Sequence, residues 1–165
     1  SQIAYYDLDS VSPLLVLFRP QNFREQCILV ENLDSYLSKN VALVTVDTIT
    51  SLYRVELGGE EETFVLNSGL NGQLAYLMQT AKTEDVAVLL TSQVHSVVGG
   101  EGVVGRIEPV ATRVLRFWSQ NILNLKMALK PRVREAFLEK HFGRERRGIH
   151  CLFMLTETGV ADMER

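Results

Sequence analysis

The sequence has 165 residues, 46% of them hydrophobic and 22% charged, which is the composition of an ordinary globular domain with one sizeable core. No apolar run approaches the roughly 18 residues of a membrane span, and the first residues lack the basic segment of a signal peptide. We therefore expect neither a membrane-inserted nor a secreted protein.

Charge is distributed unevenly along the chain. The formal net charge is −3, which by itself argues against a nucleic-acid-binding protein. Residues 1–105 carry −8, however, residues 106–147 carry +7 and residues 148–165 carry −2. Such asymmetry favours a region that faces a polyanion. The alternative is a solvated basic face that only balances the acidic one.

The first third of the chain predicts a strand and a helix around a short apolar run. Residues 2–9 are typical of a strand that ends in acidic residues, and a second apolar run, residues 14–20, stops at Pro20. Residues 22–39 have apolar positions at helical spacing, with Asn22 as the expected N-cap.

A strand–helix–strand unit follows. Residues 41–47 and 86–93 are nearly continuous apolar runs that close on polar residues, which is typical of parallel strands buried on both faces. Residues 70–85 place their apolar side chains on one helical stripe, and the acidic residues 58–62 are expected in a loop. Together these segments predict a βαβ unit.

The last third changes character. Residues 109–119 predict a helix with Pro109 in its first turn. Residues 121–129, 132–141 and 148–159 alternate, are rich in β-forming residues and have turn residues between them. They predict an antiparallel meander appended to the parallel sheet.

The cysteines and histidines predict no metal site. Cys27 and Cys151 form no CxxC motif, and we expect both to be buried free thiols in a reducing cytoplasm. His95, His141 and His150 are scattered without the spacing of metal ligands.

A glycine-rich segment, GxGxxG from Gly100 to Gly105, has the form of a dinucleotide-binding loop. That loop must directly follow a strand and be followed, about 20 residues on, by an acid that holds the ribose. Five residues separate Gln93 from Gly99, and residues 109–134 contain no Asp or Glu. Both supporting features are missing, so we reject a dinucleotide site.

The apolar run that ends at Asp47 has the form of a Walker B strand, in which the aspartate holds the Mg²⁺ of a bound nucleoside triphosphate. The alternative is an aspartate that caps the next helix. The matching Walker A motif, GxxxxGK[ST], does not occur in the sequence.

Four segments in this order resemble one family: VALVTVDTITSLYRVE (41–56), LTSQVHS (90–96), FLEKHFGRERRG (137–148) and FMLTETGVADME (153–164). Over nearly the whole chain they are similar to the archaeal RadB family, paralogues of the RecA-type recombinases. The resemblance implies an α/β fold, a RecA-like P-loop ATPase core with a mostly parallel sheet flanked by helices and C-terminal antiparallel strands.

The resemblance also implies roles at the nucleotide. Asp47 corresponds to the Walker B aspartate that binds Mg²⁺, and Asp9 stands where the family has a catalytic glutamate, one methylene longer. Gln93 corresponds to the residue that senses the γ-phosphate. Lys140, with His141 and Arg144, lies where the family has basic residues near the subunit interface, and one of them could reach a neighbour's phosphate. The alternative for these three is the solvated end of a hairpin.

DNA contact is implied for the glycine-rich segment. In the family, the residues corresponding to 95–108 form a mobile loop that contacts DNA, and its glycines let backbone N–H groups approach phosphates closely. The alternative is a surface loop without a ligand. The residues that we expect to contact DNA are Gly99, Gly100, Gly102, Gly105, Arg106, Arg144, Arg146 and Arg147.

The function implied is DNA repair and homologous recombination, with binding of single-stranded or branched DNA, ATP and Mg²⁺, and weak hydrolysis at most. The expected partners are a RecA-family recombinase and, in a homo-oligomer, further copies of this chain. The rival functions are a non-catalytic paralogue that binds a partner recombinase, and a RecA-superfamily ATPase without a DNA role. We interpret residues 1–165 as one RecA-like core without its N-terminal P-loop strand and helix. We therefore expect the purified protein to exceed 18.6 kDa.

Overall fold

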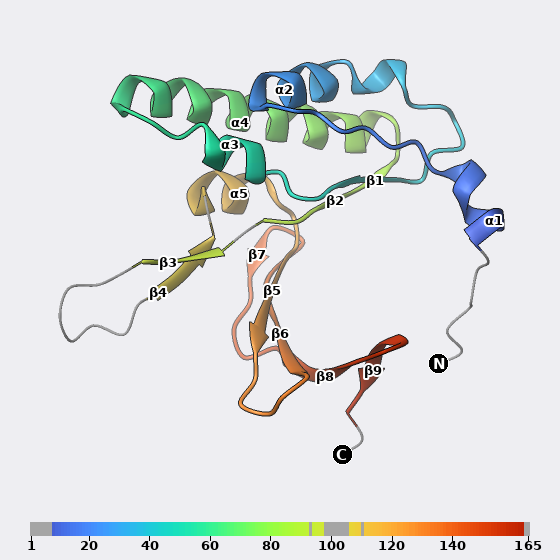
Figure 1. The fold of residues 1–165 in the computed structure, drawn as a ribbon, viewed down its shortest axis with the longest axis vertical. Coiled ribbons are helices and arrows are strands. Elements are labelled where there is room, and N and C mark those ends of the chain that lie inside the picture. Colours follow the sequence, from blue (N-terminus) through green and yellow to red (C-terminus); the bar gives the residue numbers. More distant parts are fainter. Residues whose placement is uncertain (1–7, 93, 98–105, 110, 164–165) are drawn as a thin grey trace. The chain divides into compact units, whose positions relative to one another are not determined.

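The computed structural model describes residues 8–92, 94–97, 106–109 and 111–163. The chain divides into two compact units, residues 1–92 and residues 93–165 (Figure 1). The helical elements are α1 (Leu8–Val11), η1 (Ser12–Leu14), α2 (Phe23–Glu31), η2 (Leu33–Ser35), α3 (Ser51–Val55), α4 (Glu60–Thr83) and α5 (Thr112–Trp118). The strands are β1 (Leu43–Val46), β2 (Ala87–Leu90), β3 (Val94–Val97), β4 (Arg106–Pro109), β5 (Ile122–Met127), β6 (Val133–His141), β7 (Arg144–Glu145), β8 (His150–Thr156) and β9 (Gly159–Asp162).

The first unit contains the predicted βαβ motif. β1 and β2 pair in parallel, with Leu43 opposite Ala87, and α4 connects them. The prediction of burial on both faces was wrong, because side chains alternate between half-buried and exposed along both strands. Leu43 and Leu89 are 54% and 52% exposed. In Figure 1, α2, α3 and α4 lie on one side of the two strands, so within the described part of the first unit the helices cover that side.

The core of the first unit is built by α4 against α2. Leu70, Leu74 and Leu77 are 0–2% exposed, as the helical stripe predicts. Gly69 lets α2 approach closely, because a Cβ at this position would lie 3.0 Å from a ring carbon of Phe23. Burying each such leucine contributes about 1.5–3 kcal/mol to the stability of the unit.

Helix α2 begins as predicted but ends early. Asn22 is its N-cap, and the side chain accepts a hydrogen bond from Glu25 N at 2.8 Å. The helix stops at Glu31 instead of continuing to residue 39, because Asn32 Nδ2 donates to Ile28 O at 2.7 Å and occupies a carbonyl of the last turn.

Two predictions near helix starts were wrong. Residues 60–62 do not form a loop but the first turn of α4, where Glu62 Oε2 accepts a hydrogen bond from Gly59 N at 2.9 Å. This carboxylate satisfies a backbone donor at the helix start and suits the positive end of the helix dipole. Residues 8 and 9 lie in α1 and not at the end of a strand, and residues 2–7 fall outside the described part of the chain.

The second unit contains the predicted antiparallel meander. The sheet order is β5-β6-β8-β9, and β7 pairs with the end of β6. The three predicted strands are confirmed, whereas β7 and β9 were not predicted. Cys151 in β8 is exposed and Cys27 in α2 is half-buried, so the expectation that both thiols are buried was wrong for Cys151.

The segment around the glycines differs from a simple loop. Its ends form the antiparallel pair β3 and β4, with Val97 opposite Arg106, and residues 98–105 fall outside the described residues. Pro109 ends β4, so it is not in the first turn of α5, which begins at Thr112. Within the described ranges, no helix combines the length and the apolar character needed to cross a membrane.

Candidate functional sites

The carboxyl ends of β1 and β2 are held together around Asp47. Thr91 Oγ1 donates a hydrogen bond to Asp47 Oδ1 at 2.5 Å, and Ile49 N donates to Thr91 O at 3.1 Å. One residue further along each segment, the hydroxyls of Thr50 and Ser92 lie 3.4 Å apart. Asp47 is exposed, so its carboxylate is accessible from solvent. The described part of the first unit ends at Ser92, and the next residue, Gln93, lies outside the described residues.

Two buried glutamines are hydrogen-bonded to each other, and one of them also binds the backbone just after Asp47. Gln26 on α2 and Gln73 on α4 are 4% and 1% exposed. Gln26 Nε2 donates to Gln73 Oε1 at 2.8 Å and to Ile49 O at 3.1 Å, two residues after Asp47. Sequence analysis missed both residues. Their positions on otherwise apolar helix stripes were the only available signal.

The residues around Asp47 suit Mg²⁺ bound together with a phosphate. Within the described residues, no cluster of three or more His, Cys, Asp or Glu side chains could hold a metal alone. Asp47 supplies a carboxylate, and Thr48 Oγ1 beside it is buried without a described partner. An oxygen-only set with one carboxylate fits Mg²⁺, which usually takes its other ligands from water and phosphates.

Of the other residues expected at the nucleotide, only Asp9 lies in the described part of the unit that contains Asp47. Asp9 lies exposed in α1, and no hydrogen bond or ion pair between described residues joins it to Asp47. Gln93 lies outside the described residues. Lys140 belongs to the second unit.

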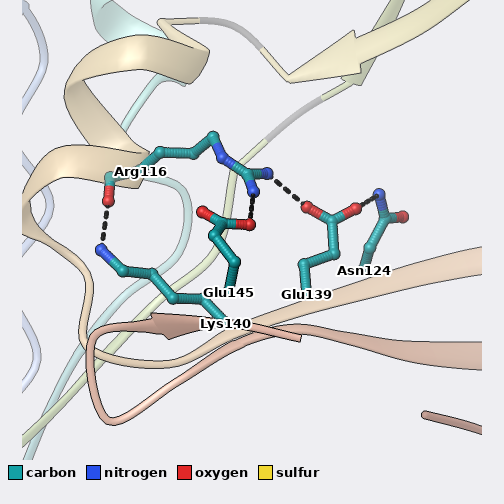
Figure 2. Close-up of polar contacts among 5 residues, drawn as sticks. All are labelled: Arg116, Asn124, Glu139, Lys140 and Glu145. Atoms are coloured by element: carbon teal, nitrogen blue, oxygen red, sulfur yellow. Dashed lines mark hydrogen bonds and ion pairs between the residues drawn. The ribbon is translucent and has the colours of Figure 1, made fainter. Parts of the chain in front are cut away.

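An ion-pair network in the second unit centres on Arg116 of α5 (Figure 2). Its guanidinium donates to Glu139 Oε2 of β6 at 2.6 Å and to Glu145 Oε2 of β7 at 2.5 Å. The hydrogen bond to Glu139 is the main reason why the pKa of Arg116 is raised. Asn124 Nδ2 of β5 donates to the other oxygen of Glu139 at 2.8 Å. The network therefore joins one helix to three strands.

The two basic residues at the end of β6 also have internal partners. Lys140 Nζ donates to the backbone oxygen of Arg116 at 2.6 Å, where a cation is favoured by the carboxyl end of α5. A ring nitrogen of His141, Nδ1, lies 3.1 Å from Asn121 Oδ1. Lys140 keeps two of its three N–H donors free of this contact, so the expected phosphate contact stays a hypothesis.

The hairpin after β6 carries three exposed arginines, Arg144, Arg146 and Arg147, which we call the arginine tip. None of the three side chains forms an ion pair or hydrogen bond with another described residue. By contrast, the Arg116 guanidinium forms ion pairs with two carboxylates, and the Lys126 ammonium lies 4.6 Å from the centroid of the Phe137 ring. Arg106 lies in β4, and the four predicted DNA-contacting glycines lie outside the described residues. The arginine tip is thus a cluster of exposed, unpaired guanidiniums within the basic region, in which Arg113, Lys130 and Arg132 are also exposed.

Comparison with known proteins identifies relatives over almost the whole chain. The model of the Rad51 family matches residues 3–163. "DNA repair and recombination protein RadB" of Methanocaldococcus jannaschii is 33% identical over 162 residues, which are 96% of this chain and 71% of that protein. The protein of the same name from Thermococcus kodakarensis is 34% identical over 90% of this chain and 64% of its own length.

A third relative and a solved structure agree with these two. RadB of Methanosphaera stadtmanae is 30% identical over 85% of this chain, but the match covers only 59% of that protein. The crystal structure of the RadB recombinase superposes with a TM-score of 0.71 at 32% identity, covering 94% of this chain and 67% of that one. The chain thus spans about 59–71% of the length of these relatives.

Proposed function

The chain belongs to the Rad51 family, where its relatives are the archaeal RadB proteins, and we propose that it acts on DNA in repair and homologous recombination. The predicted RecA-like α/β fold is confirmed by the similarity to the RadB recombinase structure. Such a role would place the protein in the cytoplasm. Because the chain is shorter than its relatives, the activity of the whole protein is part of this proposal.

The observation that carries DNA binding is the arginine tip. When a protein binds nucleic acid without sequence preference, contacts from Lys and Arg to phosphates supply most of the affinity. Three exposed guanidiniums within four residues, unpaired with any described carboxylate, provide such contacts. Arg106 and the glycines Gly99, Gly100, Gly102 and Gly105 would add a second contact region on single-stranded or branched DNA.

We propose ATP and Mg²⁺ as cofactors of the complete protein. Asp47 would hold Mg²⁺, and the hydrogen bond from Thr91 would fix the orientation of its carboxylate. When bound, Mg²⁺ would neutralise charge on the phosphates during transfer. Gln93 would respond to the γ-phosphate and Lys140 would contact a phosphate. Asp9 would orient water weakly because its side chain is short, so we expect slow hydrolysis at most.

A partner-binding role is the second candidate. Leu14, Leu15 and Leu17 are 66–79% exposed in a short continuous segment. Clustered exposed apolar side chains often mark protein–protein contacts. They favour a recombinase of the RecA family, or a second copy of this chain, as a partner.

The test is single-stranded DNA binding by fluorescence anisotropy at 50 and 200 mM salt. We compare the wild type with R144Q/R146Q/R147Q and with R24Q/K39Q/K82Q, which removes the same charge from exposed positions of the first unit. Each lost phosphate contact lowers the salt slope by about 0.7, so the arginine-tip variant should lose about 2 units and the matched control almost none. Equal loss in both variants, or no binding by the wild type, would refute the proposed role of the tip.

A further inference from the structure

Arg116 belongs to the basic region by sequence but not by its surroundings. It is one of 11 Lys and Arg residues within residues 106–147. Its guanidinium binds two carboxylates, at 2.6 Å to Glu139 and 2.5 Å to Glu145 (Figure 2). A guanidinium occupied in this way has little capacity left for a DNA phosphate. Any contribution of Arg116 to nucleic-acid binding is therefore indirect.

The two glutamates face Arg116 because several contacts fix their positions. Glu139 also accepts a hydrogen bond from Asn124 at 2.8 Å, and its backbone oxygen accepts one from Arg146 N at 2.8 Å. Lys140 donates to the Arg116 backbone oxygen at 2.6 Å. The end of α5 is therefore tied to β6 and to the hairpin that follows β6.

Strand geometry separates Glu145 from its neighbouring arginine. In the β6–β7 pair, Lys140 is opposite Glu145 and His141 is opposite Arg144. Opposite residues share a face of a sheet, and successive residues alternate between faces except at a bulge, such as the register shift of β5 against β6 at Glu139. Glu145 therefore shares the face of Lys140, where both contact Arg116, and Arg144 lies on the other face. The Glu145 carboxylate contacts Arg116 of α5, whereas the Arg144 side chain has no ion pair with a described residue.

We propose that Arg116 is a positioning residue for nucleic-acid binding. It sequesters the carboxylates of Glu139 and Glu145, so that the arginine tip presents only positive charge to the phosphates. This inference rests on the proposed DNA-binding function and adds that an internal ion-pair network keeps two carboxylates away from the arginine tip. Arg116 itself makes no contact with the nucleic acid.

The consequence concerns Glu145 above all. Its side chain is 63% exposed and it lies between Arg144 and Arg146 in the sequence. Without Arg116, this carboxylate can turn to the arginines and compete with phosphates for them. Loss of Arg116 then removes one cation and also releases the Glu145 carboxylate beside the arginine tip.

The test is a double-mutant cycle of Arg116 and Glu145, with binding to a labelled single-stranded oligonucleotide as the readout. At 50 mM salt we expect R116Q to weaken binding by roughly three- to tenfold. E145Q alone should change affinity less than about twofold, since Arg116 already neutralises this carboxylate. R116Q/E145Q should return to within about twofold of the wild type.

A matched control separates local rescue from net charge. R116Q/E157Q has the same net charge as R116Q/E145Q, but it removes an exposed carboxylate from the turn between β8 and β9. It should bind as weakly as R116Q. Circular dichroism melts of every variant show whether the second unit remains folded. If R116Q unfolds, E145Q still tests the coupling, because it leaves the Arg116–Glu139 pair in place. A clear loss of affinity in E145Q contradicts the inference.

The outcomes distinguish the two proposals. If the wild type binds DNA but E145Q fails to rescue R116Q better than E157Q does, the positioning role of Arg116 is wrong and the DNA-binding proposal stands. An unchanged affinity in R116Q overturns the positioning role as well. If the wild type shows no salt-sensitive binding, both proposals fail together.

Discussion

The buried glutamine pair of the first unit gives the sharpest prediction for stability. Gln26→Leu removes the amide that donates to Ile49 O and to Gln73 Oε1. Both acceptors then lack this donor in a site where the two glutamines are 4% and 1% exposed. A buried polar group without its partner costs about 1–3 kcal/mol, so Q26L should lower the free energy of unfolding by about 2–5 kcal/mol.

The double variant makes the reasoning testable beyond simple destabilisation. Q26L/Q73L removes the Gln73 acceptor too, and leaves only Ile49 O and the weak acceptor Cys27 Sγ without their donors. The double variant should therefore be no less stable than Q26L, although it changes one more buried residue. The two effects are coupled because the side chains touch.

Hydrogen exchange of the α4 backbone amides is the suitable assay, because it reports the opening of the first unit alone. The control is Q79L, an exposed position on the same helix, which should change the free energy by less than about 0.5 kcal/mol. A change below 0.5 kcal/mol in Q26L, or additive losses in Q26L/Q73L, would show that the glutamine pair is not an internally satisfied network.

Two further predictions concern the same unit. Asn22→Ala removes the N-cap hydrogen bond to Glu25 N and should destabilise α2 by about 1 kcal/mol, measured by amide exchange in that helix; no change would contradict the cap. Burial raises the pKa of the Cys27 thiol, so its contribution to stability is present below about pH 8.5 and lost as the pH rises through the folded-state value. Iodoacetamide should modify Cys27 more slowly than exposed Cys151 at pH 8, and peptide mass spectrometry should show equal rates in denaturant.

Local patterns in the sequence were sufficient for the regular elements. The βαβ unit followed from two short apolar runs and one helical stripe, because strands and amphipathic helices leave distinct patterns of apolar residues, although the predicted burial of both strand faces was wrong. Asn22 was identified as an N-cap for a similar local reason, since the capping bond spans only three residues. The start of α4 at Glu60 was not predicted, because three acidic residues after two glycines are typical of a loop. In the structure, the Glu62 carboxylate accepts a hydrogen bond from Gly59 N and caps the helix.

What the sequence by itself determined was the family, the order of most elements and the concentration of positive charge in residues 106–147. Only the tertiary structure decided which of those charges are available. Arg116 lies 23 residues from Glu139 and 29 from Glu145, and a count of charges treats all three as independent. Coulomb attraction and hydrogen bonding act over a few ångströms in space, so pairing depends on which side chains the fold brings together. The same holds for Gln26 and Gln73, whose burial arises from the packing of two helices 47 residues apart in the chain.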